Sequence, residues 1–223
     1  MSAPATHLAT LPSEFAIFPL AGALLLPHAR LPLNIFEPRY CAMVEDALGE
    51  GRIFGMIQPD PSRAELPNGP ALFAIGSLGR ITAFSETDDG RYLITLTGLC
   101  RFRLEQELAL RRGYRRARAA LAPFAQDLRV PEAVELEREP ILAALKSYLA
   151  TRNLGADWKA LEALPDERLV GALCMLCPLP PTEKQALLEA PTEAARAETL
   201  LTLLRMDAYA QPGGGTEKTP LAS

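Results

Sequence analysis

Hydrophobic and polar residues alternate one by one in two neighbouring stretches of the first half of the chain. Large apolar side chains recur at every second position from residue 91 to 97 and again from residue 101 to 108, where Phe102 would face inward and Arg101 outward. An Asp-Gly pair ending at Gly90 precedes the first stretch and favours a tight turn, because glycine adopts positive φ without strain. The pattern predicts an antiparallel pair of strands with one buried face.

Further short apolar segments, separated by glycine and proline, continue this pattern to residue 122. They predict strands at residues 15–20, 31–36, 52–58, 72–85 and 114–121, the fourth of them bent near Gly76 and Gly79. Pro19 and Pro32 lie within two of these strands and indicate edge positions or bulges, because proline lacks the N–H that a strand ladder needs. Six or seven short strands with frequent turn residues predict a barrel-like sheet.

The spacing of apolar residues becomes helical in two places. The first is a helix over residues 38–49, with Glu37 as its cap, Pro38 in its first position and Gly49 at its end. The second place is the chain after Pro123, where helices are predicted at residues 134–150, 157–164, 165–176 and 182–189, and from 192 onward. We expect a β-rich part at 14–122, a helical part at 123–209, and flexible tails at 1–13 and 210–223.

Three details of the helical part are specific enough to check. Pro140 falls inside the first helix and should break or kink it. Thr182 and Gln185 have the spacing of a capping box, which would begin the fourth helix. Thr192 is placed to cap the last helix, whose core face would carry Ala197, Leu200, Leu201 and Leu204.

Composition narrows the class of protein. Hydrophobic residues make up 48% and charged residues 22% of the chain, which is enough apolar material for a folded core. The net charge is 23 − 27 = −4, so binding to nucleic acid through phosphate neutralisation is not favoured. The N-terminus lacks the pattern of a signal peptide and no apolar run is long enough for a membrane span. We therefore expect a cytoplasmic protein without a membrane partner.

Residues with catalytic or metal-binding chemistry are few. Cys174 and Cys177 have redox spacing, but they fall at the end of a predicted helix among large apolar residues, so we expect them to pack in the core. A redox or metal role is the alternative. His7 and His28 have no evident partners for a catalytic triad. We predict no catalytic residues, no cofactor and no metal site.

Several motifs, in order along the chain, resemble the N-terminal substrate-binding domain of Lon proteases. They are Phe18-Pro19-Leu20, residues 31–40, residues 89–92, Thr97-Gly98 and residues 101–103, followed by residues 164–167 and 180–189. The first-half residues that carry the resemblance are Pro19, Pro32, Phe36, Glu37, Pro38, Arg39, Tyr40, Gly90, Gly98, Arg101 and Phe102. The resemblance covers residues 14–207. It implies an α+β fold, in which a PUA-like pseudo-β-barrel precedes a helical bundle, and mainly structural roles for these residues.

The same resemblance implies a function in protein binding. The sequence has no Gly-x-x-x-x-Gly-Lys-Ser/Thr motif and ends where the ATPase and peptidase modules of a Lon protease would begin. We therefore expect a stand-alone, non-catalytic module that binds unfolded or extended protein segments or a specific partner, with an adaptor-like role in protein quality control. Its oligomeric state stays open. The groove between barrel and helices, an open barrel edge and the loop at residues 59–70 are the expected binding surfaces.

Two further segments allow a structural or a functional interpretation. In the basic run from Arg111 to Arg118, Tyr114, Arg116 and Arg118 would share one face of a strand. This face could bind RNA, or it could be a charged edge strand that prevents aggregation, which is the interpretation we favour. Glu37 to Tyr40 could likewise form a binding loop. We favour a helix start, in which Tyr40 packs and Arg39 bonds neighbouring carbonyls.

Overall fold

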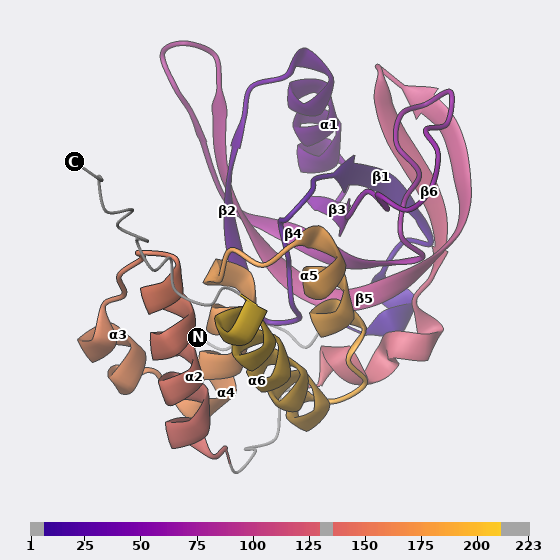
Figure 1. Cartoon of the computed structure of the whole chain (residues 1–223). Coiled ribbons are helices and arrows are strands. Elements are labelled where there is room, and N and C mark those ends of the chain that lie inside the picture. Colours follow the sequence, from indigo (N-terminus) through magenta and orange to yellow (C-terminus); the bar gives the residue numbers. More distant parts are fainter. Residues whose placement is uncertain (1–6, 130–135, 211–223) are drawn as a thin grey trace, which may run out of the picture.

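The structure, a computed structural model, describes residues 7–129 and 136–210. A closed sheet forms the first part of the molecule and a group of helices lies against one end of it (Figure 1). The elements of the first part are β1 (Glu14–Pro19), β2 (Arg30–Ile35), α1 (Pro38–Gly49), β3 (Ile53–Ile57), β4 (Ile75–Glu86), β5 (Tyr92–Arg111) and β6 (Tyr114–Ala120). This is the α+β arrangement that the sequence predicts.

The sheet closes into a barrel because β6, the last strand in the order, pairs with β5, which lies near its start. The order is β2-β5-β4-β3-β1-β6, and β6 pairs with β5 as well as with β1. Only β1 and β3 run parallel among the strand pairs described. The expectation that the arginine-rich strand lies at an edge is therefore wrong. It is β6, and barrel closure gives it a neighbour on either side.

A single long strand replaces the two predicted around residue 98. β5 runs for 20 residues, pairing with β2 over Tyr92–Thr97 and with β6 from Arg103 to Arg111. Gly98 stands where these halves meet. A Cβ atom at this position would lie 2.1 Å from the carbonyl oxygen of Leu26, so only glycine allows the chain to pass.

Arg101 does not face solvent as the alternation predicts, since its exposed fraction is only 3%. A short 3-10 segment, η2 (Ala122–Leu128), and the helices cover this side of β5. Nε of Arg101 donates to Asp127 at 2.8 Å, and another guanidinium nitrogen donates to the carbonyl oxygen of Ala190 at 2.7 Å. The buried guanidinium thus joins the barrel to the helices, and strand alternation fails here because both faces are covered.

Two glutamines bridge the same junction. Gln58 Nε2 donates to the carbonyl oxygen of Pro181 at 3.1 Å, and Gln185 Nε2 donates to that of Ile75 at 3.0 Å. Both side chains are buried. These hydrogen bonds join the barrel directly to the helices. They do not favour a partner-binding groove between the two parts, which we expected from the sequence.

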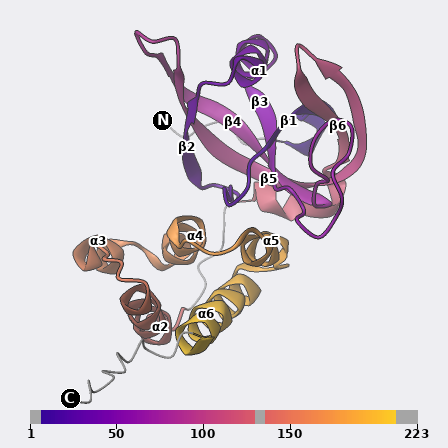
Figure 2. The same cartoon turned by 45° about the horizontal axis from the view of Figure 1, so that its top comes forward.

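The second part of the molecule consists of packed helices below the barrel (Figure 2). They are α2 (Arg138–Thr151), α3 (Trp158–Ala163), α4 (Asp166–Leu176), α5 (Pro181–Glu189) and α6 (Glu193–Ala210). Their core contains Tyr148, Leu169, Cys174 and Leu200, together with Leu24 from the chain between β1 and β2. A domain boundary at residue 122 stays a prediction. No helix within the described ranges is both long and apolar enough to cross a membrane.

The positions at which the helices begin contradict two predictions and confirm one. Pro140 lies in the first turn of α2, where no backbone donor is needed. The helix therefore includes this proline near its start, and the predicted break or kink is wrong. Helix α5 begins at Pro181 without a side-chain cap, so the capping box predicted from Thr182 is wrong. Thr192 does cap α6, because its hydroxyl accepts a hydrogen bond from the N–H of Ala195. Residues 134 and 135, predicted to be helical, lie outside the described residues.

Part of the predicted N-terminal tail is folded. Leu8–Thr10 forms a 3-10 helix, and Leu8 and Leu11 pack against the barrel core. Residues 1–6 and 211–223, for which we predict flexibility, lie outside the described residues.

Candidate functional site

One corner of the sheet extends beyond the barrel as a three-stranded arm. We call it the β2–β5–β4 arm, and it consists of residues 30–35, 81–86 and 92–97. Its two longer strands end in a hairpin that projects past α1 at the upper left of Figure 1. Asn34, Leu93 and Ser85 form one cross-strand row of this arm, and Pro32, Thr95 and Ala83 form the next.

The two faces of the arm differ. The face toward α1 carries Ile94 and Leu96, which are buried in the same cluster as Met43 and Val44 of the helix. The opposite face carries Leu93 and the residues that share its rows, and we call it the open face. α1 covers only the first of these faces, since strand residues alternate between the two sides of a sheet.

Large apolar side chains are exposed on this arm. The exposed fraction is 41% for Phe84 and 47% for Leu93, and it reaches 65% for Phe36, which directly follows β2. The rings of Phe84 and Tyr92 lie 5.1 Å apart, and the Tyr92 hydroxyl donates to Glu45 of α1 at 3.1 Å. Burial, together with the carboxylate of Glu45, raises the pKa of Tyr92. The arm therefore combines apolar surface with nearby negative charge.

The backbone of β2 is open on one side. Among the described strands, β2 pairs only with β5. The N–H of Gly98 donates to the carbonyl oxygen of Ala29, and the N–H of His28 donates to that of Gly98, each at 2.9 Å. By alternation, the backbone N–H and C=O groups of residues 31, 33 and 35 of β2 point toward β5, and those of residues 30, 32 and 34 point toward the free edge. Pro32 thus lies where its missing N–H costs no ladder bond, as predicted for an edge strand.

The segment Glu37 to Tyr40 forms a helix start. Glu37 occupies the cap position but makes no capping bond, and Pro38 is the first helical residue. Tyr40 is buried against Phe18, with ring centroids 4.3 Å apart. Arg39 donates to the carboxylate of Glu37 at 2.9 Å, and not to carbonyls as we expected. Nothing in this geometry forms a separate binding loop.

The remaining family-motif residues support the fold. Pro19 ends β1, and Gly90 holds a φ of +78° in the turn between β4 and β5. Phe102 is buried edge-on against Phe15 at 5.1 Å. Phe36 differs from the others, because it is the large apolar member of the set that is exposed. The sequence did not single out Phe84 or Leu93 as binding residues, although alternation placed Leu93 on the face opposite Ile94 and Leu96.

The arginine cluster from residue 111 to 118 is balanced by carboxylates. Each of its arginines lies within 4 Å of at least one acid, and the pairs are Arg111–Asp46, Arg111–Glu50, Arg112–Glu45, Arg112–Asp46, Arg115–Glu107, Arg116–Glu14 and Arg118–Glu14. Tyr114 is only 2% exposed and donates to Asp46 at 2.7 Å, and burial with this bond raises its pKa to about 12. It offers no stacking surface, so this face does not favour RNA binding.

Cys174 and Cys177 are buried free thiols in the helical core. Burial raises the pKa of Cys174 to about 12 and that of Cys177 to about 11, which suppresses the reactive thiolate. His7 is exposed, and His28 Nε2 lies 2.8 Å from the carbonyl oxygen of Asp127. In the part of the chain that the structure describes, no three His, Cys, Asp or Glu side chains are grouped as metal ligands.

Comparison with solved structures places the fold. The chain is 27% identical to a crystal structure titled as a Lon N-terminal domain protein from Xanthomonas campestris, with a TM-score of 0.55 and coverage of 85% of this chain and 97% of that one. The N-terminal domain of the Mycobacterium avium complex Lon protease gives the same TM-score at 15% identity, which supports the fold alone.

Curated relatives are much longer than this chain. Lon protease 2 of Sorangium cellulosum is 30% identical over 141 residues, which cover 62% of this chain and 16% of that protein. Lon protease 2 of Myxococcus xanthus is 27% identical over 199 residues, which cover 87% of this chain and 24% of that protein. The family model for the ATP-dependent protease La (LON) substrate-binding domain matches residues 14–206, so the chain belongs to the family of Lon substrate-binding domains.

Proposed function

We propose that this protein binds extended segments of other proteins without catalysis of its own, and that the β2–β5–β4 arm is the binding surface. The observation that carries the proposal is the open edge of β2, which ends at the exposed ring of Phe36. An extended segment can add to such an edge through backbone hydrogen bonds, while an apolar residue of the segment covers the ring. The name of the matching family, a substrate-binding domain, supports this assignment.

The edge would accept segments of varied sequence. Its outward groups are the carbonyl oxygens of residues 30, 32 and 34 and the N–H groups of Arg30 and Asn34, because Pro32 has none. Backbone bonds do not read side chains, so affinity would depend on whether the segment is extended and has an apolar residue near Phe36. A folded protein buries most of its large apolar residues and pairs most of its extended segments. Such binding suits an adaptor-like role in cytoplasmic protein quality control, which forms part of the proposal.

The experiment compares two forms of one client protein. A reduced and alkylated, permanently unfolded protein is titrated against the wild-type chain, with its native form as the control, and binding is followed by fluorescence anisotropy. We expect saturable binding of the unfolded form alone. Phe36→Ser should weaken it by about tenfold or more, because burying a large apolar side chain contributes about 1.5–3 kcal/mol.

A second variant tests the strand edge itself. Asn34→Pro removes an outward N–H while leaving the ladder to β5 intact, and should weaken binding in the same assay. Leu110→Ser is the control for loss of an exposed apolar side chain, since Leu110 is 47% exposed but lies near the far end of β5, away from the edge of β2. Absence of saturable binding by the wild type, or equal loss in all three variants, would contradict the proposal.

A further inference from the structure

The open face of the β2–β5–β4 arm is hollowed at its centre and carries no charged side chain there. The hollow has a volume of about 510 Å³. Uncharged residues around one exposed leucine line it on this face, namely Pro32, Asn34, Ala83, Ser85, Leu93 and Thr95. Charged residues are likewise depleted at the centre of protein interfaces. The hollow is therefore suited to an apolar side chain from another molecule.

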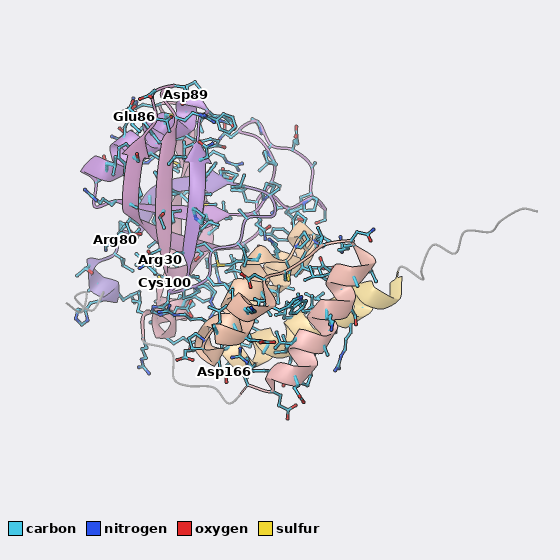
Figure 3. All side chains as sticks on the ribbon, turned by 90° about the vertical axis from the view of Figure 1, so that its left-hand side faces the viewer. Arg30, Arg80, Glu86, Asp89, Cys100 and Asp166 are labelled. Atoms are coloured by element: carbon cyan, nitrogen blue, oxygen red, sulfur yellow. The ribbon has the colours of Figure 1, made fainter. Side chains whose placement is uncertain are left out.

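Two arginines lie side by side at one end of this hollow. Arg30 and Arg80 are both opposite Thr97 in the register, so the three residues form one row across the arm and share the open face. Neighbouring strands are about 4.8 Å apart, which puts the backbones of the two arginines about 10 Å apart. Figure 3 shows both arginines at the lower end of the strands.

These two arginines have no counter-charge. Neither forms an ion pair or a side-chain hydrogen bond with any residue that the structure describes, whereas every arginine from residue 111 to 118 is paired. The hydroxyls of Thr82 and Thr97 bond to each other at 3.0 Å. The two guanidinium groups are thus free to donate to an anion from outside, and their planar donors match a carboxylate.

The opposite end of the open face adds no free positive charge. Arg91 follows Leu93 on this face by alternation, and it is paired with Asp89 at 2.7 Å. Residues 86–91 of the hairpin contain three acids and one arginine, a balance of 1 − 3 = −2. A nucleic acid or an anionic lipid surface would be repelled by this hairpin. A single carboxylate on a protein segment can reach the arginine pair without meeting it.

We propose that the open face binds an acidic segment of a partner protein, with one carboxylate between Arg30 and Arg80 and an apolar side chain in the hollow beside Leu93. Thr97 and Leu93 are four residues apart in β5, which is about 13 Å at about 3.3 Å per residue. An extended segment covers this distance with three residues between its acid and its apolar residue. The inference goes beyond the proposed function, because it uses side chains of the open face and not the backbone edge of β2.

A synthetic peptide provides the first test. It carries one glutamate and one leucine separated by three serines, and it is titrated against the isotope-labelled full chain while amide shifts are followed by NMR. We expect saturable shifts at Thr97 and Leu93. The same peptide with glutamine in place of glutamate should bind about fivefold more weakly, because an exposed ion pair contributes up to about 1 kcal/mol.

Matched variants locate the contact. Arg30→Gln with Arg80→Gln should weaken binding of the glutamate peptide about fivefold, for the same reason. Arg103→Gln with Arg168→Gln is the control, since it removes the same charge from two exposed arginines elsewhere and should leave binding unchanged. Arg30→Glu with Arg80→Glu should bind the peptide only after its glutamate is replaced by lysine. Such an exchange of charges restores binding only if the two groups meet.

The apolar contact has its own control. Leu93→Ser should weaken binding, whereas Leu110→Ser, at a position that is also 47% exposed, should not.

Several results would overturn the inference. They are no saturable binding of the peptide by the wild type, equal affinity for the glutamine peptide, equal loss in the control arginine variant, and tighter binding of anionic vesicles or RNA at the same arginines. None of these results would remove the proposed function. The unfolded client bonds to the backbone edge of β2, which Arg30→Gln with Arg80→Gln leaves in place.

Discussion

Replacing Arg101 by methionine tests whether one buried guanidinium holds the barrel and helices together. Its side chain donates to both carboxylate oxygens of Asp127 at 2.8 Å and to the carbonyl oxygens of Leu188 and Ala190. The guanidinium also stacks on the ring of Phe124, with its carbon 5.0 Å from the ring centroid. Methionine fills similar space but leaves two carbonyl groups without this donor, and the buried carboxylate keeps the backbone N–H of residue 101 but loses its charged partner.

The expected cost is large. Removing one partner of a buried ion pair destabilises a protein by about 3–5 kcal/mol. With a urea dependence of about 2 kcal/mol per molar, the unfolding midpoint should fall by about 2 M. Trp158 is the one tryptophan of the chain and lies in α3, so its fluorescence reports on the helices, while circular dichroism follows the whole fold.

Two further variants make the result interpretable. Arg103→Met removes an exposed arginine two residues along the same strand and should change stability by no more than about 0.5 kcal/mol. Arg101→Met combined with Asp127→Asn removes the buried charge as well, so the midpoint should recover in part. If Arg101→Met shifted the midpoint no more than Arg103→Met does, the reasoning from the buried pair would be refuted.

Four other outcomes follow from particular contacts. Gly98→Ala should cost about 3 kcal/mol in urea unfolding because its Cβ meets Leu26, whereas Gly49→Ala, with open space around it, should not destabilise. Alkylation at pH 8 should reach Cys41 before Cys174 and Cys177, which should react only in urea, since burial raises their pKa to about 12 and about 11. The pKa of Tyr114 rises from 10.0 to about 12 on folding, so its contribution to stability is complete below pH 10 and is lost between pH 10 and about 12. Tyr114→Phe should therefore lose less stability than the wild type over that pH range. Single-stranded RNA should not bind saturably at 150 mM salt, because the arginines of β6 are paired with carboxylates. An RNA affinity that falls steeply with salt and is lost in Arg118→Ala would contradict this reasoning.

Local patterns were sufficient for most of the elements. The Asp-Gly turn before residue 91, the alternation that follows it and the Pro38 helix start all appear in the structure near their predicted positions. Each depends on contacts close in sequence or on backbone preferences of single residues. Pro140 was misjudged for a related reason, because proline is tolerated in a first turn and the true start of α2 could not be placed.

Long-range packing decided what the sequence could not show. The burial of Arg101 depends on η2 and α5, and α5 begins about 80 residues later in the chain, so alternation along β5 contained no signal for it. Closure by the β5–β6 pairing likewise turned a predicted edge strand into an internal one. The exposure of Phe84 arises because its strand runs past the end of the barrel, which is a property of the whole sheet.

The continuity of β5 has a mechanical consequence. β2 would connect a segment docked along its free edge to the half of β5 that leads, within three residues of Gly98, to the Arg101 anchor. Ladder hydrogen bonds are perpendicular to the strands, so a pull along the segment would load them all at once in shear. They would have to break together instead of opening one after another. The load would then pass through a single extended strand into the helices, so the arm should resist force applied along the docked segment.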